Sequence, residues 1–172
     1  SESGSDHPSN WPIDLDGDDV PDDHLAVLDY SLDDIVNLVQ LPANLASSPF
    51  AQPMVGSVAS MVRAIYHEHV GWFDGDPAKL WTLPSQEHAR RLIDAMGGAS
   101  GALQYARKSL TEHTREGAQM ALEVAEYLRQ VSPSDDANDI YINALKMLGF
   151  TTKSALERNW YLQEAYRAEM GH

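Results

Sequence analysis

The sequence has 172 residues, a formal net charge of −14 at pH 7 and no cysteine. That length suits one domain with a tail or linker, and it is enough to bury a core without covalent cross-links. The lack of cysteine excludes disulfides, thiolate zinc sites and thiol nucleophiles. No apolar run approaches the ~20 residues of a membrane-spanning helix, and no basic face is available to neutralise phosphates. We therefore expect neither a membrane span nor a nucleic-acid partner.

The acidic charge is concentrated at the start of the chain. Residues 1–62 hold eleven acidic side chains and neither lysine nor arginine. Residues 1–29 are polar and lack apolar periodicity, which predicts an acidic, mostly disordered arm. The chain begins at Ser1 and not at Met, which is compatible with a removed targeting segment, so the sequence leaves the localisation open.

Three carboxylates in this arm, Asp14, Asp16 and Asp18, have a spacing that resembles calcium-binding loops. An EF-hand needs glycine at the sixth loop position and glutamate at the twelfth, where this sequence has Asp19 and Leu25. We interpret the segment as a solvated acidic tail, with calcium binding as the alternative. No other metal site and no cofactor is predicted.

The remainder of the chain is predicted to be helical. The apolar residues recur with the 3.6-residue period of a helix face, and serine, proline and glycine mark the boundaries. The predicted helices, in chain order, are about 32–41, 58–73, 85–96, 99–113, 115–131, 135–148 and 152–169. No segment alternates with period two for long enough to predict a strand. The short loops make neighbouring helices antiparallel, so we predict an all-α domain over residues 30–172, with a stack of helical hairpins like tetratricopeptide repeats in its C-terminal half.

The most informative stretch is residues 62–84, where a helix runs into a Gly-Asp-Pro turn. Trp72, Phe73 and Trp81 lie around that turn. Because each aromatic ring can bury a large area, three of them flanking one turn predict a corner fixed by aromatic burial.

The candidate chemical groups lie beside this corner. His67 and His69 are two residues apart, so on a helix they point about 200° from each other and do not share one metal ion. A cluster of Tyr66, His69 and Asp74 would suit acid/base chemistry if a cleft opened there. A half-buried, hydrogen-bonded histidine is the simpler interpretation.

Near the C-terminus, Arg158 and Trp160 belong to a predicted last helix. The simple interpretation packs Trp160 onto the helical stack with Arg158 at its edge. The alternative is a ligand pocket formed by aromatic and basic side chains. Its predicted lining residues are Tyr66, Trp72, Trp81, Arg158 and Trp160.

Several of these segments resemble the dimerisation domain of the alkyl sulfatases of the metallo-β-lactamase superfamily. Within residues 62–84 the match is V-R-A-I-Y followed by G-W-F-D-G-D-P-A-K-L-W-x-L-P. Met96-Gly97-Gly98 agrees in order and spacing. Further matching segments are Leu32-Asp33-Asp34-Ile35-Val36, Leu41-Pro42, Arg158-Asn159, Tyr161-Leu162 and Ala165. The resemblance covers roughly residues 30–168, and His67-Glu68-His69 is a departure from it.

The resemblance implies a helical domain that embraces a second copy of itself. The sequence has neither the His-x-His-x-Asp-His zinc motif of the family's catalytic domain nor its sterol-carrier-like domain, so sulfate-ester hydrolysis is not carried over. The first hypothesis is therefore a homodimeric interaction module that docks a separate metallo-β-lactamase-fold hydrolase. The second is a small helical enzyme or carrier of an apolar small molecule, with His67 or His69 as the acid/base group. Whether the chain is itself an enzyme stays open at this point.

Overall fold

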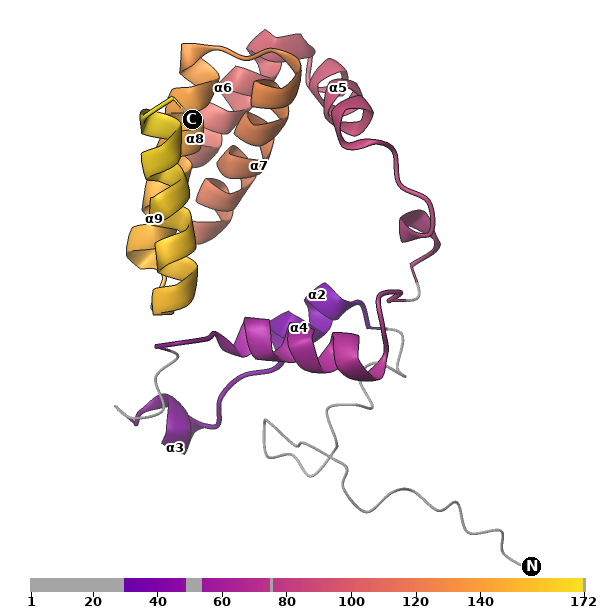
Figure 1. Ribbon diagram of the computed structural model, residues 1–172, viewed down its shortest axis with the longest axis vertical. Coiled ribbons are helices and arrows are strands. Elements are labelled where there is room, and N and C mark those ends of the chain that lie inside the picture. Colours follow the sequence, from indigo (N-terminus) through magenta and orange to yellow (C-terminus); the bar gives the residue numbers. More distant parts are fainter. Residues whose placement is uncertain (1–29, 49–53, 75, 172) are drawn as a thin grey trace, which may run out of the picture. The chain divides into compact units, whose positions relative to one another are not determined.

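A computed structural model describes residues 30–48, 54–74 and 76–171 (Figure 1). Over these ranges the regular secondary structure consists of helices, and no strand is present. The prediction of an all-α chain is confirmed. None of the helices in these ranges is long and apolar enough to cross a membrane. The acidic arm and its calcium alternative at Asp14, Asp16 and Asp18 lie outside the described residues.

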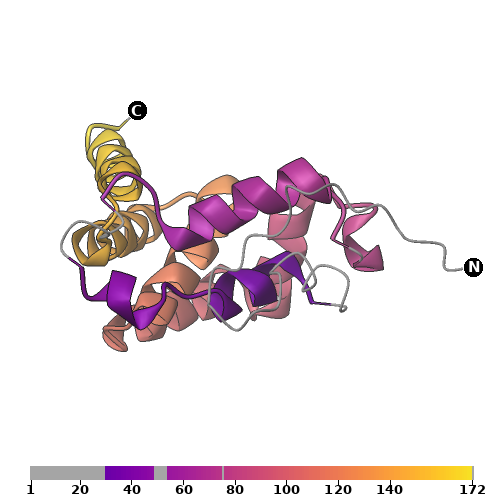
Figure 2. The ribbon, with the colours of Figure 1, turned by 90° about the horizontal axis from the view of Figure 1, so that it is seen from below.

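The chain divides into two compact units between Trp81 and Thr82. The first unit contains α2 (Leu32–Leu38), α3 (Ala43–Ala46), α4 (Val58–His69) and a short 3-10 helix at Pro77–Lys79. Helices α2 and α4 lie side by side (Figures 1 and 2). Between them is a small core of four buried side chains, Ile35, Val39, Val62 and Tyr66.

Both helices of this pair begin at the serine that the sequence predicts. The Ser31 hydroxyl accepts a hydrogen bond from the Asp34 amide at 3.2 Å, and the Asp34 carboxylate accepts one from the Ser31 amide at 3.2 Å. Ser57 and Ser60 cap α4 in the same reciprocal way. This arrangement is a capping box, which satisfies amide donors that have no partner within the helix.

Helix α4 ends at His69, four residues before the predicted end at Phe73. Gly71 has a φ of 98°, in the left-handed region that terminates a helix. The amides of Val70 and Gly71 both donate to the Tyr66 carbonyl oxygen. The apolar period that continues to Phe73 therefore does not describe one helix, because Gly71 turns the chain first.

The second unit contains five helices in its described residues: α5 (Ser85–Ala95), α6 (Gly98–Thr111), α7 (Arg115–Val131), α8 (Asp135–Thr151) and α9 (Ala155–Glu169). Helices α6 to α9 each pack against the next, and α5 packs on α6 and α7 (Figures 1 and 2). The last three helices begin at Thr114, Ser134 and Ser154, whose side chains accept from amides of the first turn. The closer likeness to tetratricopeptide repeats stays a prediction.

Small residues let the helices of the second unit approach closely. Its fully buried positions are mostly alanine, with Val124, Leu128 and Leu148 as the largest fully buried side chains. A Cβ atom built on Gly117 would lie 2.4 Å from the Ser109 carbonyl oxygen, and one on Gly149 would lie 2.7 Å from a methyl group of Leu162. Interiors are close-packed, so a side chain at Gly117 would force the two helices apart, and one at Gly149 would have to displace the Leu162 side chain.

Candidate interaction surfaces

The two candidate histidines lie in the last turn of α4. His67 and His69 are both exposed, whereas Tyr66 beside them is buried. The Nδ1 atom of His67 is 3.1 Å from the Gly71 carbonyl oxygen, and its ring meets the Tyr66 ring edge-on at 6.3 Å between centroids. Burial raises the pKa of Tyr66, and the nearby Asp74 carboxylate raises it further. Tyr66 is therefore a neutral hydrogen-bonding group at neutral pH.

The turn after α4 is organised by the carboxylate of Asp74. It forms an ion pair with Lys79 and accepts a hydrogen bond from the Asp76 amide at 3.2 Å. The Asp74 side chain is only 7% exposed, and the hydrogen bond from Lys79 lowers its pKa. Asp76 in turn accepts from the Ala78 amide at 2.9 Å, which starts the 3-10 helix. The five-residue spacing of Asp74 and Lys79 across a Gly-Asp-Pro turn was the available sequence signal for this pair.

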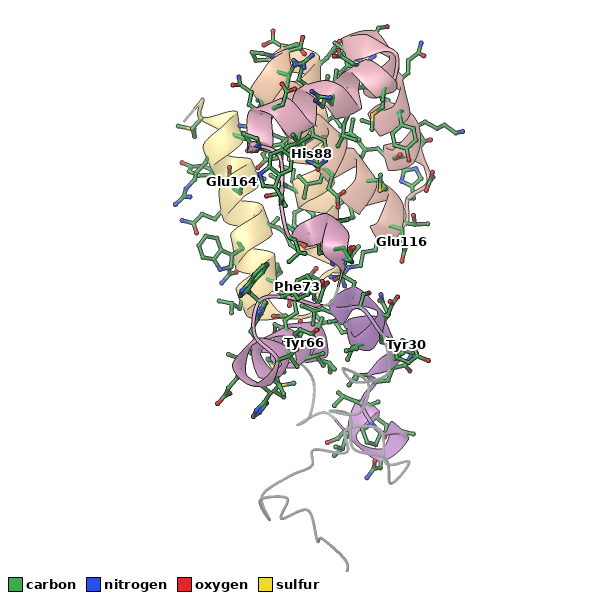
Figure 3. All side chains as sticks on the ribbon, turned by 90° about the vertical axis from the view of Figure 1, so that its right-hand side faces the viewer. Tyr30, Tyr66, Phe73, His88, Glu116 and Glu164 are labelled. Atoms are coloured by element: carbon green, nitrogen blue, oxygen red, sulfur yellow. The ribbon has the colours of Figure 1, made fainter. Side chains whose placement is uncertain are left out.

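The two tryptophans of the turn are exposed, whereas Phe73 is half-buried. Trp72 is 71% exposed and Trp81 is 76% exposed, and Trp72 contacts Phe73 at 5.5 Å between ring centroids. Figure 3 labels Tyr66, at the end of α4, and Phe73, in the turn that follows. The prediction of a corner fixed by aromatic burial is wrong, because both tryptophans are exposed and the contacts within the turn are those of the Asp74 carboxylate.

The residues predicted to line a ligand pocket are divided between the units. Tyr66, Trp72 and Trp81 belong to the first unit, whereas Arg158 and Trp160 belong to α9 of the second. The ligand pocket and the acid/base role of His67 or His69 stay predictions.

Trp160 is 64% exposed on α9, so the interpretation that packs it onto the stack is wrong. Tyr161 and Ala165 make that contact instead. Exposed apolar side chains thus occur in both units, on the turn of the first and on α9 of the second.

A polar groove of about 690 Å³ lies in the second unit, where α7 ends and α8 begins. Three carboxylates and one guanidinium line it, together with neutral polar groups; Glu164 on its wall is labelled in Figure 3. The lining residues are Glu126, Arg129, Gln130, Pro133, Ser134, Asp135, Asn138, Tyr141 and Glu164.

Arg129 and Tyr141 contact each other in this groove. The guanidinium carbon of Arg129 lies 3.9 Å from the centroid of the Tyr141 ring, in the geometry of a cation–π contact. Burial raises the pKa of Tyr141, and the carboxylates of Glu126 and Glu164 raise it further. The tyrosine therefore stays protonated at neutral pH, and its hydroxyl can donate a hydrogen bond in the groove.

Metal-ligand geometry is absent from the part of the chain that the structure describes, because no three His, Asp or Glu side chains converge there.

Comparison with known families agrees with the resemblance seen in the motifs. The family model described as alkyl sulfatase dimerisation matches residues 31–171. The chain belongs to the alkyl sulfatase dimerisation family.

Among curated proteins, a linear primary-alkylsulfatase of a Pseudomonas strain is 37% identical over 139 residues, which are 80% of this chain and 26% of the relative. An alkyl/aryl-sulfatase of Saccharomyces cerevisiae is 27% identical over 83% of this chain and 22% of the relative. Among solved structures, the stereoselective inverting sec-alkylsulfatase Pisa1 from Pseudomonas superposes with a TM-score of 0.81 at 28% identity, over 88% of this chain and 24% of that one. This chain spans about a quarter of the length of the relatives that it matches.

Proposed function

We propose that this chain is a dimerisation module that forms a homodimer over residues 30–172. The observation that carries the proposal is the imbalance of the first unit, whose described residues bury four apolar side chains while several larger ones are exposed. The most exposed of these after residue 60 are Met61, Val70, Trp72, Leu80 and Trp81.

A core of this size does not hold two short helices and a turn in place by itself. Small units bury too little apolar surface to offset their conformational entropy, and oligomerisation is one of the usual remedies. The exposed tryptophans are also the residue type that is enriched at the centres of protein interfaces. A second copy of the chain is the partner that fits a module of this family.

The second part of the proposal is that the dimer docks a metallo-β-lactamase-fold hydrolase on a separate chain. The support is the similarity of this chain to proteins that are named as alkylsulfatases. In that assembly the hydrolase carries the sulfate-ester chemistry, and this chain sets the spacing of two such enzymes.

Sedimentation equilibrium between about 1 and 100 μM tests the homodimer, a range in which interfaces of standard size assemble. We expect twice the chain mass for the wild type and a shift toward monomer for the double variant Trp72→Ser/Trp81→Ser. Tyr105→Ser on α6 is the matched control, since Tyr105 is also an exposed aromatic residue. A wild-type monomer across the whole range would overturn the proposal.

The small-enzyme or carrier hypothesis stays the alternative. Thermal-shift measurements with alkyl chains as probes test it, using His67→Ala and His69→Ala as the variants. A probe-induced shift that either variant abolishes would favour this alternative, and shifts that neither variant changes would remove its candidate residues.

A further inference from the structure

Helix α9 has two apolar faces, and only one of them is covered within its own unit. Tyr161, Ala165 and Ala168 belong to or pack against the main core, next to α8. On the other side, Leu156, Trp160, Tyr166 and Met170 are each more than half exposed, at 54%, 64%, 61% and 57%. A surface helix with one core-facing stripe would be polar on this side.

The exposed apolar residues are arranged symmetrically about Gln163. Trp160 and Tyr166 lie three residues before and after it, and Leu156 and Met170 lie seven residues before and after it. Since a helix turns 100° per residue, all four fall within about 60° of the direction of Gln163. Spacings of three, four and seven residues are those by which one helix packs along another.

We propose that α9 pairs with α9 of a second copy, antiparallel, about a two-fold axis at Gln163. A two-fold interface requires a self-complementary surface, in which residue i meets residue j and j meets i. Antiparallel pairing about Gln163 places Trp160 against the partner's Tyr166 and Leu156 against the partner's Met170. This inference rests on the proposed homodimer and names the surface that forms it.

The polar residues of the same face follow the same symmetry. Asn159 and Arg167 lie four residues before and after Gln163, so an amide meets a guanidinium twice in the pair. Arg167 also lies 3.7 Å from Glu164 of its own helix. Arg167 is the one charged residue of this face, whose seven residues are Leu156, Asn159, Trp160, Gln163, Tyr166, Arg167 and Met170. Two copies of a chain with net charge −14 can therefore approach through this face without repulsion between like charges in the contact.

The exposed area of this α9 face determines what share of a dimer interface it can supply. Aromatic side chains bury about 150–250 Å² each, so four large side chains that are more than half exposed present on the order of 500 Å² per copy. A standard interface takes about 800 Å² from each partner. The exposed face of α9 therefore supplies more than half of a standard interface.

Single-cysteine variants test the seam directly, because the natural sequence has no cysteine. Packed helix axes lie about 8–10 Å apart and Cα atoms about 2.3 Å from each axis, so two facing Gln163 Cα atoms come within about 6 Å. That separation is within the range of a disulfide. We expect Gln163→Cys to form a covalent dimer on mild oxidation of the full chain.

Asn159→Cys is the matched control on the same exposed face. In the antiparallel pair its two copies lie about 12 Å apart along the axis, beyond the reach of a disulfide. We expect about tenfold more covalent dimer from Gln163→Cys than from Asn159→Cys. The double variant Asn159→Cys/Arg167→Cys restores cross-linking, because position 159 of one copy faces position 167 of the other in this register. Gln104→Cys, on the exposed side of α6, reports random collisions.

Sedimentation of the same unoxidised variants separates the two proposals. A dimer in which Gln163→Cys and the double variant link no better than Gln104→Cys would overturn the α9 seam and leave the homodimer standing; the face would then be covered by the first unit or by a hydrolase. Efficient linking of both Gln163→Cys and Asn159→Cys would indicate parallel helices and would overturn the antiparallel register. A wild-type monomer would overturn the homodimer and the seam together.

Discussion

The two units of this chain differ in how their stability is obtained. The second unit has a continuous core that draws residues from all five of its helices. The described residues of the first unit bury four side chains between α2 and α4, while Trp72 and Trp81 are exposed. One half of the chain is therefore a scaffold with its own core, whereas the described part of the other half exposes large apolar side chains beside a core of four residues.

The largest expected effect is at the centre of the second unit. Leu128 is completely buried on α7, so Leu128→Ala removes apolar contacts and leaves a cavity. We expect a loss of about 2–5 kcal/mol in the free energy of unfolding. Urea denaturation followed by circular dichroism measures it. Met120→Ala on the same helix is the control, because Met120 is 37% exposed. Equal losses for both variants would contradict the assignment of the core.

A close helix contact gives the next largest effect. Gly117→Ala places a Cβ atom 2.4 Å from the Ser109 carbonyl oxygen, so α6 and α7 must move apart. We expect a loss of about 1–3 kcal/mol in unfolding free energy. The sign of the change in unfolding free energy is informative, because replacing glycine by alanine at an open helix position stabilises a protein by about 1 kcal/mol. A stabilised Gly117→Ala variant would show that α6 and α7 are far enough apart to accept a Cβ atom at position 117.

In the first unit, Ile35→Val tests how far the small core is independent of the scaffold. Ile35 is 4% exposed between α2 and α4, and removing one methylene group costs about 0.5–1.5 kcal/mol. Hydrogen exchange measures the two units separately. We expect faster exchange in α2 and α4 with unchanged exchange in α6 to α9. Faster exchange throughout the chain would show that the units unfold as one.

This contrast also explains which features the sequence made predictable. The helices of the second unit could be predicted because their boundaries are local: Ser85 follows a proline, and Met96-Gly97-Gly98 ends α5. The all-α class follows from the same periodicity. The Gly-Asp-Pro turn was predicted, but the ion pair of Asp74 and Lys79 was missed, since it depends on the folded path of that turn.

The environment of the aromatic residues was not predictable, for a physical reason. An apolar residue in a sequence shows that burial is favourable, but it does not show whether the covering atoms come from the same chain. Trp72, Trp81 and Trp160 were expected to support corners and packing within the fold, and all three are exposed. Their periodicity is the same in a core and in an interface.

The smallest expected effect concerns an exposed cluster on α5, where hydrogen bonds from Arg90 and Arg91 lower the pKa of Glu87 to about 2. A depressed carboxyl pKa stabilises the fold fully above the unfolded value of about 4.5, and this contribution is lost as the pH falls toward 2. Glu87→Gln should therefore flatten the dependence of melting temperature on pH between these values, without changing the dependence above pH 6. An acid profile as steep as that of the wild type would contradict this role.

The exposed tryptophans give the molecule a built-in optical signal. Indole emission shifts to shorter wavelength when the ring leaves water, and Trp72, Trp81 and Trp160 have their rings in water within a single copy. Assembly through the turn of the first unit and through α9 would move all three at once. Simple dilution, without a dye or tag, should then trace the association of copies as a gradual red shift of the intrinsic fluorescence.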